Sequence, residues 1–192
     1  MGKDRLAAFS DGVIAIIITI MVLELRIPHG ADLAALKGVA PNFLSYVMSF
    51  IYLGIYWNNH HHLLHTVTRV DGLILWANSH LLFWLSLVPA ATAWMGENFL
   101  APLPTAVYGI SLLMPAIAYN LLQRTIVRQQ GEHSVLASAL GRDVKGKISP
   151  LLYAAAVALA FVDAWLSIAI YALVAVMWLI PNRRIEKVLR EG

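Results

Sequence analysis

Long apolar runs separated by short polar connections are the feature that most constrains this chain of 192 residues. A helix needs about 20 mostly apolar residues to cross a hydrocarbon core about 30 Å thick, because it rises about 1.5 Å per residue. The runs predict spans at about 6–27, 42–64, 73–94 and 105–127, followed by an apolar stretch over 149–180. Hydrophobic residues make up 59% of the chain, more than the roughly 45–50% of ordinary globular domains. We therefore expect an all-α membrane protein.

The stretch over 149–180 is too long for one ordinary span, and Asp163 lies near its middle. An unpaired carboxylate costs several kcal/mol inside the hydrocarbon core. Two short helices over 149–161 and 164–180, with Asp163 capping the second, avoid this cost. We therefore expect six transmembrane helices in a single domain over residues 1–192.

The basic residues give a separate test of the number of spans, because Lys and Arg accumulate on the cytoplasmic side. Of the 14 Lys and Arg residues, six spans leave only Arg26 and Lys37 outside and therefore 12 inside. Five spans would move Arg183, Arg184, Lys187 and Arg190 across and divide the 14 residues as 8 and 6. We expect a multi-pass protein of the cell (inner) membrane with both termini cytoplasmic. This orientation explains the basic balance without nucleic acid as a partner.

A polar cluster ends the second predicted span, and the chain has no cysteine that could join it in a metal or haem site. His61 and His65 are four residues apart and share a helix face, the spacing of two metal or haem ligands. His60, His61 and His62, however, spread over about 200° of the helical wheel. Polar packing, a metal site and a pH-sensitive network all stay open; we favour polar packing and expect no bound metal or cofactor. The cluster comprises Trp57, Asn58, Asn59, His60, His61, His62 and His65.

The middle of the first predicted span is an almost purely aliphatic run, in which Thr19 is the one polar residue. An aliphatic stripe lies along one face of this span. On a wheel of 100° per residue the stripe falls within about 80°, with Asp11 nearly opposite. Considered alone, such a stripe is typical of ordinary helix packing. Asp11 needs partners inside a membrane bundle, and Asn78 or His80 of the third span could supply them. The stripe comprises Val13, Ile16, Ile20, Leu23 and Ile27.

An R-x-x-x-F-S-D pattern formed by Arg5, Phe9, Ser10 and Asp11 opens the first span. With the features that follow it, the pattern resembles the endosomal and lysosomal potassium channel family named transmembrane protein 175, including its prokaryotic members. The resemblance covers nearly the full length. The later features are Trp57, His60, His61, Arg69, Asp71, Asn78, Pro89, Pro181, Asn182, Arg183 and Arg184.

The resemblance implies a homotetramer in the lipid bilayer, with the first helix of each subunit lining a central pore for monovalent cations. It implies a channel without enzymatic activity, modestly selective for K⁺ over Na⁺, with K⁺ as the permeant ion. Ile16, Ile20 and Leu23 would form the pore constriction, with Thr19 as a polar selectivity element. A secondary cation transporter and a histidine-based metal or haem membrane protein are the alternatives. The implied structural and gating network is Arg5, Phe9, Ser10, Asp11, Trp57, His60, His61 and Asn78.

The selectivity also has a physical reason. A ring of isoleucines that excludes liquid water forces a passing ion to lose part of its hydration shell. K⁺ loses this shell at a lower cost than Na⁺. Because no charged or carbonyl group is needed, the resulting preference for K⁺ is modest.

Overall fold

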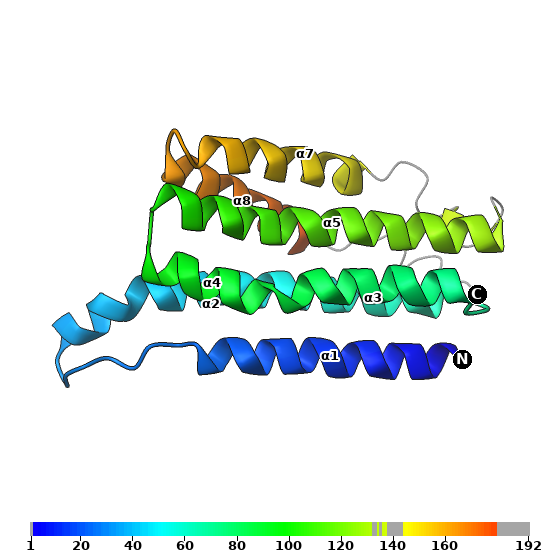
Figure 1. Ribbon diagram of the computed structural model, residues 1–192, viewed down its shortest axis with the longest axis horizontal. Coiled ribbons are helices and arrows are strands. Elements are labelled where there is room, and N and C mark those ends of the chain that lie inside the picture. Colours follow the sequence, from blue (N-terminus) through cyan, green and yellow to red (C-terminus); the bar gives the residue numbers. More distant parts are fainter. Residues whose placement is uncertain (1, 132–133, 135, 138–143, 180–192) are drawn as a thin grey trace.

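The computed structural model describes residues 2–131, 134, 136–137 and 144–179 (Figure 1). The family features at Pro181 to Arg184, and the basic residues Arg142, Lys187 and Arg190, lie outside the described residues. Within the described part, every regular element is a helix, as expected. The helices are α1 (Lys3–Leu23), α2 (Leu33–His65), α3 (Gly72–Ser86), α4 (Val88–Glu97), α5 (Pro102–Gln130), α7 (Val144–Leu159) and α8 (Ala164–Leu179).

Successive helices run in opposite directions, with α3 and α4 together making one pass (Figure 1). Leu87 separates α3 from α4, and Pro89 follows it directly in the first turn of α4. Proline has no N–H to donate into the preceding turn, so the interruption lies where Pro89 predicts a kink. Pro115, in contrast, lies within the continuous helix α5.

Aspartate side chains begin three of the helices. Asp32 accepts a hydrogen bond from the Ala35 N–H at 2.8 Å, and Asp71 accepts one from the Ile74 N–H at 2.9 Å. Asp163 accepts from the Trp165 N–H at 2.9 Å, in the turn between α7 and α8. Each carboxylate satisfies a backbone donor that has no partner inside its helix.

Three helices differ by more than three residues from the predicted spans. One is α7, which begins at Val144 and not at residue 149; the others are α1 and α2. Helix α1 ends at Leu23, so Ile27 lies beyond it and is not part of the α1 stripe. Helix α2 begins at Leu33, well before the predicted start at residue 42, and contains Pro41. Figure 1 shows the first turns of α2 leaning away from the bundle. This bend agrees with Pro41, whose ring prevents a regular helical hydrogen bond.

The helices pack around two apolar clusters. The first joins α1 to α2, α3 and α5 through residues such as Ile14, Ile17 and Leu81. The second joins α2, α4 and α5 to α7 and α8 around Tyr108 and Tyr171, both buried. Helix α1 therefore lies at one edge of the bundle, and α7 and α8 lie at the opposite edge (Figure 1).

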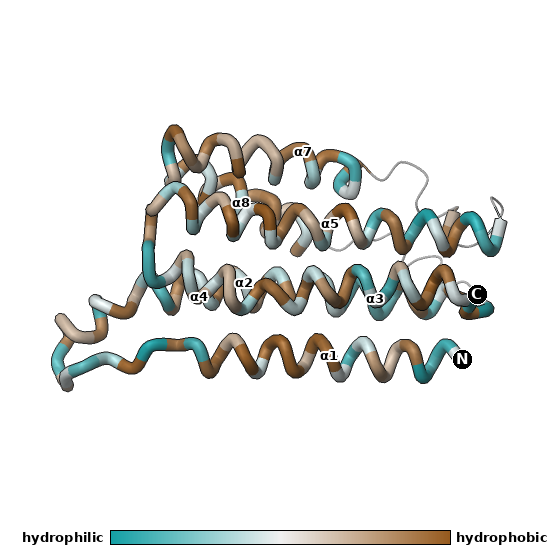
Figure 2. Tube along the Cα trace, viewed as in Figure 1, coloured by the Kyte–Doolittle hydropathy of each residue, from teal (hydrophilic) through white to brown (hydrophobic). Residues whose placement is uncertain are grey.

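The helices are long and apolar enough for a membrane. Helices α1, α2 and α5 and the combined α3–α4 pass each meet the length and hydropathy needed to cross a bilayer, and α8 is a shorter apolar helix. Figure 2 shows the apolar character of the central part of α1. In the described part, Arg26 lies between α1 and α2, and Lys37 lies near the start of α2. Figure 1 shows the start of α1, the α2–α3 connection and the end of α5 at one end of the bundle, and the α1–α2 connection at the other. The other described basic residues lie near the starts of α1 and α7, near the end of α5, or between α2 and α3: Lys3, Arg5, Arg69, Arg124, Arg128, Lys145 and Lys147.

Candidate functional site

Helix α1 has a buried face that packs against its own subunit. The residues of this face recur every three or four positions, the period of an amphipathic helix. They are mostly aliphatic, and the one polar member is Ser10, which is completely buried. The face therefore fixes the rotation of α1 against α2 and α3. Its members are Leu6, Ser10, Ile14, Ile17 and Met21.

The other side of α1 carries an apolar face that the subunit leaves uncovered. Phe9, Ile16, Ile20 and Leu23 are 56%, 60%, 43% and 77% exposed. Together with Arg5 they fall within about 60° of the helical wheel. The three residues expected to form a constriction, Ile16, Ile20 and Leu23, thus share one face that is free to meet another copy of the chain, lipid or an ion.

Thr19 is exposed near this face, and its hydroxyl is oriented by its own helix. Its Oγ1 donates a hydrogen bond to the Ala15 carbonyl at 2.9 Å. A threonine hydroxyl has one proton and two lone pairs. Because the proton is used within the helix, the lone pairs of Thr19 remain available to a cation.

A buried chain of hydrogen bonds holds the N-terminal half of α1 against α2 and α3. Asn78 Nδ2 of α3 donates to Ser10 Oγ at 3.0 Å. The Asn78 Oδ1 atom lies 2.7 Å from His60 Nε2 of α2. Ser10 itself donates to the Leu6 carbonyl at 2.9 Å. Three helices are therefore joined through one amide side chain.

Asp11 makes a separate contact to α2. Its Oδ1 accepts a hydrogen bond from the Trp57 indole N–H at 3.0 Å. Neither of the two candidates on the third span bonds Asp11, since Asn78 bonds Ser10 and His60. His80 instead accepts from the Trp84 indole N–H of its own helix at 2.8 Å. Ser10 and Asp11 are adjacent on α1, but Ser10 bonds α3 and Asp11 bonds α2.

Not every member of the expected network lies in it. Arg5 and Phe9 are on the exposed face of α1, and Arg5 makes no hydrogen bond or ion pair to the described residues. His61 stacks near the Trp57 ring, with ring centroids 6.0 Å apart, and touches the network only through it. The anchoring groups are therefore Ser10 and Asp11 on α1, with Trp57, His60 and Asn78 on the neighbouring helices.

A second anchor, which the sequence analysis did not predict, lies beyond the C-terminal end of α1. The Arg26 N–H donates to Asn42 Oδ1 of α2 at 3.1 Å, and the Arg26 guanidinium pairs with Glu97 of α4 at 2.6 Å. Gly96 permits this arrangement, because a Cβ there would lie 2.9 Å from Asn42 Cα. The indication of this anchor in the sequence was Arg26, a basic residue beside an apolar run.

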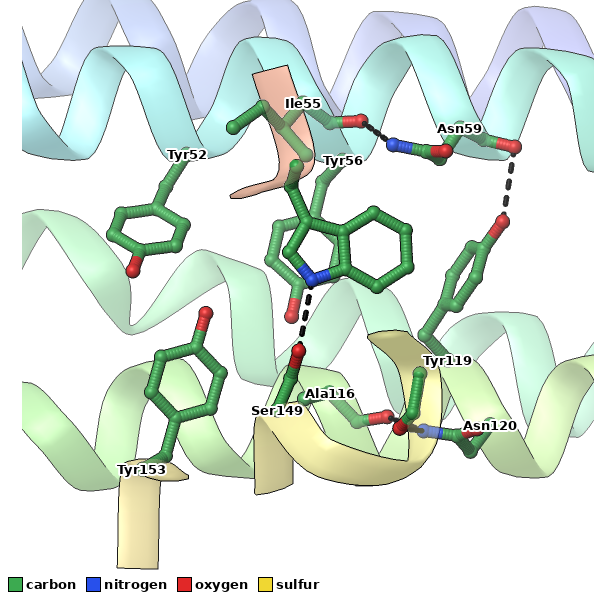
Figure 3. A pocket seen from close by; sticks show the side chains of 11 residues that line it. Tyr52, Ile55, Tyr56, Asn59, Ala116, Tyr119, Asn120, Ser149 and Tyr153 are labelled. Carbon is green, nitrogen blue, oxygen red and sulfur yellow. Dashed lines mark hydrogen bonds between the residues drawn. The ribbon is translucent and has the colours of Figure 1, made fainter. Parts of the chain in front are cut away.

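A pocket on the other side of the bundle is a weaker candidate site. It lies between α2, α5, α7 and α8, and five of its eleven lining residues are aromatic (Figure 3). Several of its polar groups are already paired: Trp178 donates to Ser149 Oγ at 2.8 Å, and Tyr119 donates to the Asn59 carbonyl at 3.0 Å. The described residues that line it include no carboxylate. The pocket therefore offers little to a cation.

The chain is similar to known potassium channels over most or all of its length. The family model described as the endosomal/lysosomal potassium channel TMEM175 matches residues 5–89. A potassium channel of Chryseobacterium sp. (strain P1-3) is 56% identical over 192 residues, which is all of both chains. A potassium channel of Chamaesiphon minutus is 31% identical over 188 residues, covering 90% of this chain and 91% of the relative.

A solved structure shows the same arrangement of helices. The crystal structure of a lysosomal potassium-selective channel TMEM175 homolog from Chamaesiphon minutus superposes with a TM-score of 0.83 at 30% sequence identity. The match covers 94% of this chain and 97% of that chain. The similarity therefore extends beyond the matched N-terminal half to the whole helical bundle.

Proposed function

Because the chain belongs to the TMEM175 family of potassium channels, which are not enzymes, we propose that it forms a cation channel modestly selective for K⁺ over Na⁺. The pore is central in a homotetramer, and α1 of each subunit lines it. The observation that carries this proposal is the uncovered apolar face of α1, which contains Ile16, Ile20 and Leu23.

The position of α1 supports assembly around this helix. Helix α1 lies at the edge of its own bundle, so one subunit does not surround the exposed face (Figure 1). The buried face is fixed by apolar packing and by the Ser10–Asn78–His60 hydrogen bonds. A helix held in this way presents the same residues outward in every subunit, which a symmetric pore requires.

The spacing of the aliphatic residues suits a dry constriction. Ile16, Ile20 and Leu23 follow one another by four and three residues, so at about 1.5 Å per residue they extend over about 10 Å. Four such side chains at each level make a hydrophobic segment that gates by excluding water. An ion in this segment has lost part of its hydration, which costs K⁺ less than Na⁺.

Thr19 provides the polar element within this segment. Its hydroxyl proton is bonded to the Ala15 carbonyl, so the oxygen offers lone pairs to a partly dehydrated cation. Four hydroxyls at one level replace some of the lost water. Their contribution is smaller than that of a filter made of carbonyl oxygens, which agrees with modest selectivity.

The two anchors determine how α1 is held along its length. Near the inner end, Ser10 and Asp11 bind α3 and α2 through Asn78 and Trp57. Beyond the outer end, Arg26 binds Asn42 and Glu97. The middle of α1, which carries the proposed constriction, is held by apolar contacts, and these allow small rotations more readily than directed hydrogen bonds do.

The proposed orientation places both termini in the cytoplasm of the cell and the protein in the inner membrane. The described basic residues gather towards the N-terminal end of the bundle, which is the cytoplasmic end under the positive-inside rule. A C-terminal tag is therefore expected to resist protease added outside intact cells. Cleavage of the tag under these conditions would contradict this orientation.

Reconstitution into liposomes tests the proposed function. Purified protein in vesicles with a K⁺ gradient is expected to carry K⁺ flux without a second ion gradient. The reversal potential with Na⁺ on the opposite side should show a preference for K⁺. Flux that requires a gradient of Na⁺ or H⁺ would indicate a coupled transporter, and absence of flux would refute the channel.

A further inference from the structure

Two histidines at the inner end of α2 form a pair that the channel mechanism does not use. His61 and His65 are one helical turn apart, and their Nε2 atoms lie 3.1 Å from each other. Their ring centroids are 4.5 Å apart. His60, by contrast, is buried and bonded to Asn78, so it belongs to the anchor of α1.

The separation of the two nitrogens matches that of two ligands on one metal ion. With Zn–N bonds of about 2.0–2.1 Å at a tetrahedral angle, two ligand nitrogens lie about 3.3 Å apart. In the square-planar geometry of Cu²⁺ the corresponding separation is about 2.9 Å. The observed 3.1 Å lies between these values. A metal ion can therefore replace the shared proton at this separation, once each ring turns so that its Nε2 lone pair points at the ion.

The pair is open to solvent ions. His65 is exposed, and His61 is partly exposed. The described residues contain no group of three or more His, Asp or Glu side chains placed to hold a metal. Water would therefore complete the coordination, as at a site that binds its metal ion reversibly. Imidazole ligands favour Zn²⁺, Cu²⁺ and Ni²⁺ over Mg²⁺ or Ca²⁺.

We propose that His61 and His65 chelate one late first-row divalent transition metal ion, such as Zn²⁺ or Cu²⁺, through their two Nε2 atoms. When both rings are neutral, one of them holds its proton on Nε2 to make the observed hydrogen bond. Metal binding moves that proton to Nδ1 of the same ring, and the chain loses no proton. This proposal does not depend on the proposed pore, because the site lies within one subunit.

Calorimetric titration of the full-length protein with ZnCl₂ tests the site, using a purification tag without histidine. The wild-type protein is expected to bind one Zn²⁺ per chain. His65→Gln is expected to weaken binding at least about tenfold, because even the outer partners of metal ligands contribute 10–100-fold to affinity. His62→Gln is the matched control, since His62 adjoins His61 but lies outside the pair, and it should bind within about twofold of wild type.

Electron paramagnetic resonance of the Cu²⁺-loaded wild-type protein gives a result that does not depend on how a variant folds. Coupling to two imidazole nitrogens is expected. Coupling to a single nitrogen, no Zn²⁺ binding by the wild type, or equal weakening by His62→Gln and His65→Gln would each overturn the proposal. Unchanged affinity in folded His65→Gln would overturn it as well.

Discussion

Replacing Asn78 by alanine is expected to destabilise the bundle by more than the loss of one hydrogen bond would. Asn78 is completely buried and bonds both Ser10 and His60. His60 Nδ1 already has no partner among the described residues, so loss of Asn78 leaves the imidazole without any hydrogen bond. The substitution therefore removes one bond to α1 and isolates a buried polar ring on α2.

The magnitude follows from these two effects. A buried polar group left without a partner costs about 1–3 kcal/mol. The lost bond to Ser10 adds about 0.6 kcal/mol, the average for hydrogen bonds between helices in membranes. Asn78→Ala should therefore lower the free energy of unfolding by about 2–4 kcal/mol. Ser10→Ala removes the hydroxyl that bonds Asn78 and the Leu6 carbonyl but leaves the Asn78–His60 bond, so it should lower the free energy of unfolding by less than Asn78→Ala does.

Unfolding of the purified protein in detergent micelles, titrated with SDS, measures these differences. Ser79→Ala is the control, because Ser79 adjoins Asn78 on α3 but is exposed. It should change the free energy of unfolding by no more than about 0.5 kcal/mol. If Asn78→Ala has no larger effect than Ser79→Ala, the buried network does not hold α1 as described.

Three further predictions concern the anchors and the pore face. Asp11→Ala removes the acceptor of the Trp57 indole and should abolish the tetramer or the current, as measured by size-exclusion chromatography and liposome flux; a stable, fully active variant would refute this role. Thr19→Val keeps the shape of the side chain but removes its hydroxyl, so the K⁺ preference in reversal potentials should fall; an unchanged ratio argues against a polar selectivity element. Glu97→Gln weakens a half-exposed ion pair with Arg26, and thermal or SDS unfolding should show a loss below about 1 kcal/mol. A much larger loss would mean that this ion pair is the main support of the outer end.

Local patterns in the sequence predicted the helices well. The apolar runs predicted the helical passes, and Asp163 predicted the turn between α7 and α8, because hydrophobic period and helix capping depend on neighbouring residues. The end of α1 at Leu23 and the early start of α2 were not predicted. Both lie where polar and apolar residues alternate near the outer end, and there the local signals for helix and loop are similar.

Contacts between helices were predicted less well. The sequence indicated that Asp11 needs a partner, but the choice between Trp57 and Asn78 depends on the rotation of α1, and adjacent residues differ by about 100° in direction. The Arg26–Glu97 pair joins residues 71 positions apart, and no periodicity predicts it. Such contacts follow from tertiary packing, which the pattern of a single helix does not contain.

The most direct test of the pore is the ion preference of Ile16→Asn. Val22→Asn is the matched control, because Val22 is also an exposed aliphatic residue of α1 but points about 120° away from Ile16. In liposomes, Ile16→Asn should admit Na⁺ nearly as readily as K⁺, since an amide in the constriction lets water and hydrated ions enter, whereas Val22→Asn should keep the wild-type preference. An unchanged ratio of K⁺ to Na⁺ permeability in Ile16→Asn, or an equal loss in both variants, would contradict a hydrophobic constriction at Ile16.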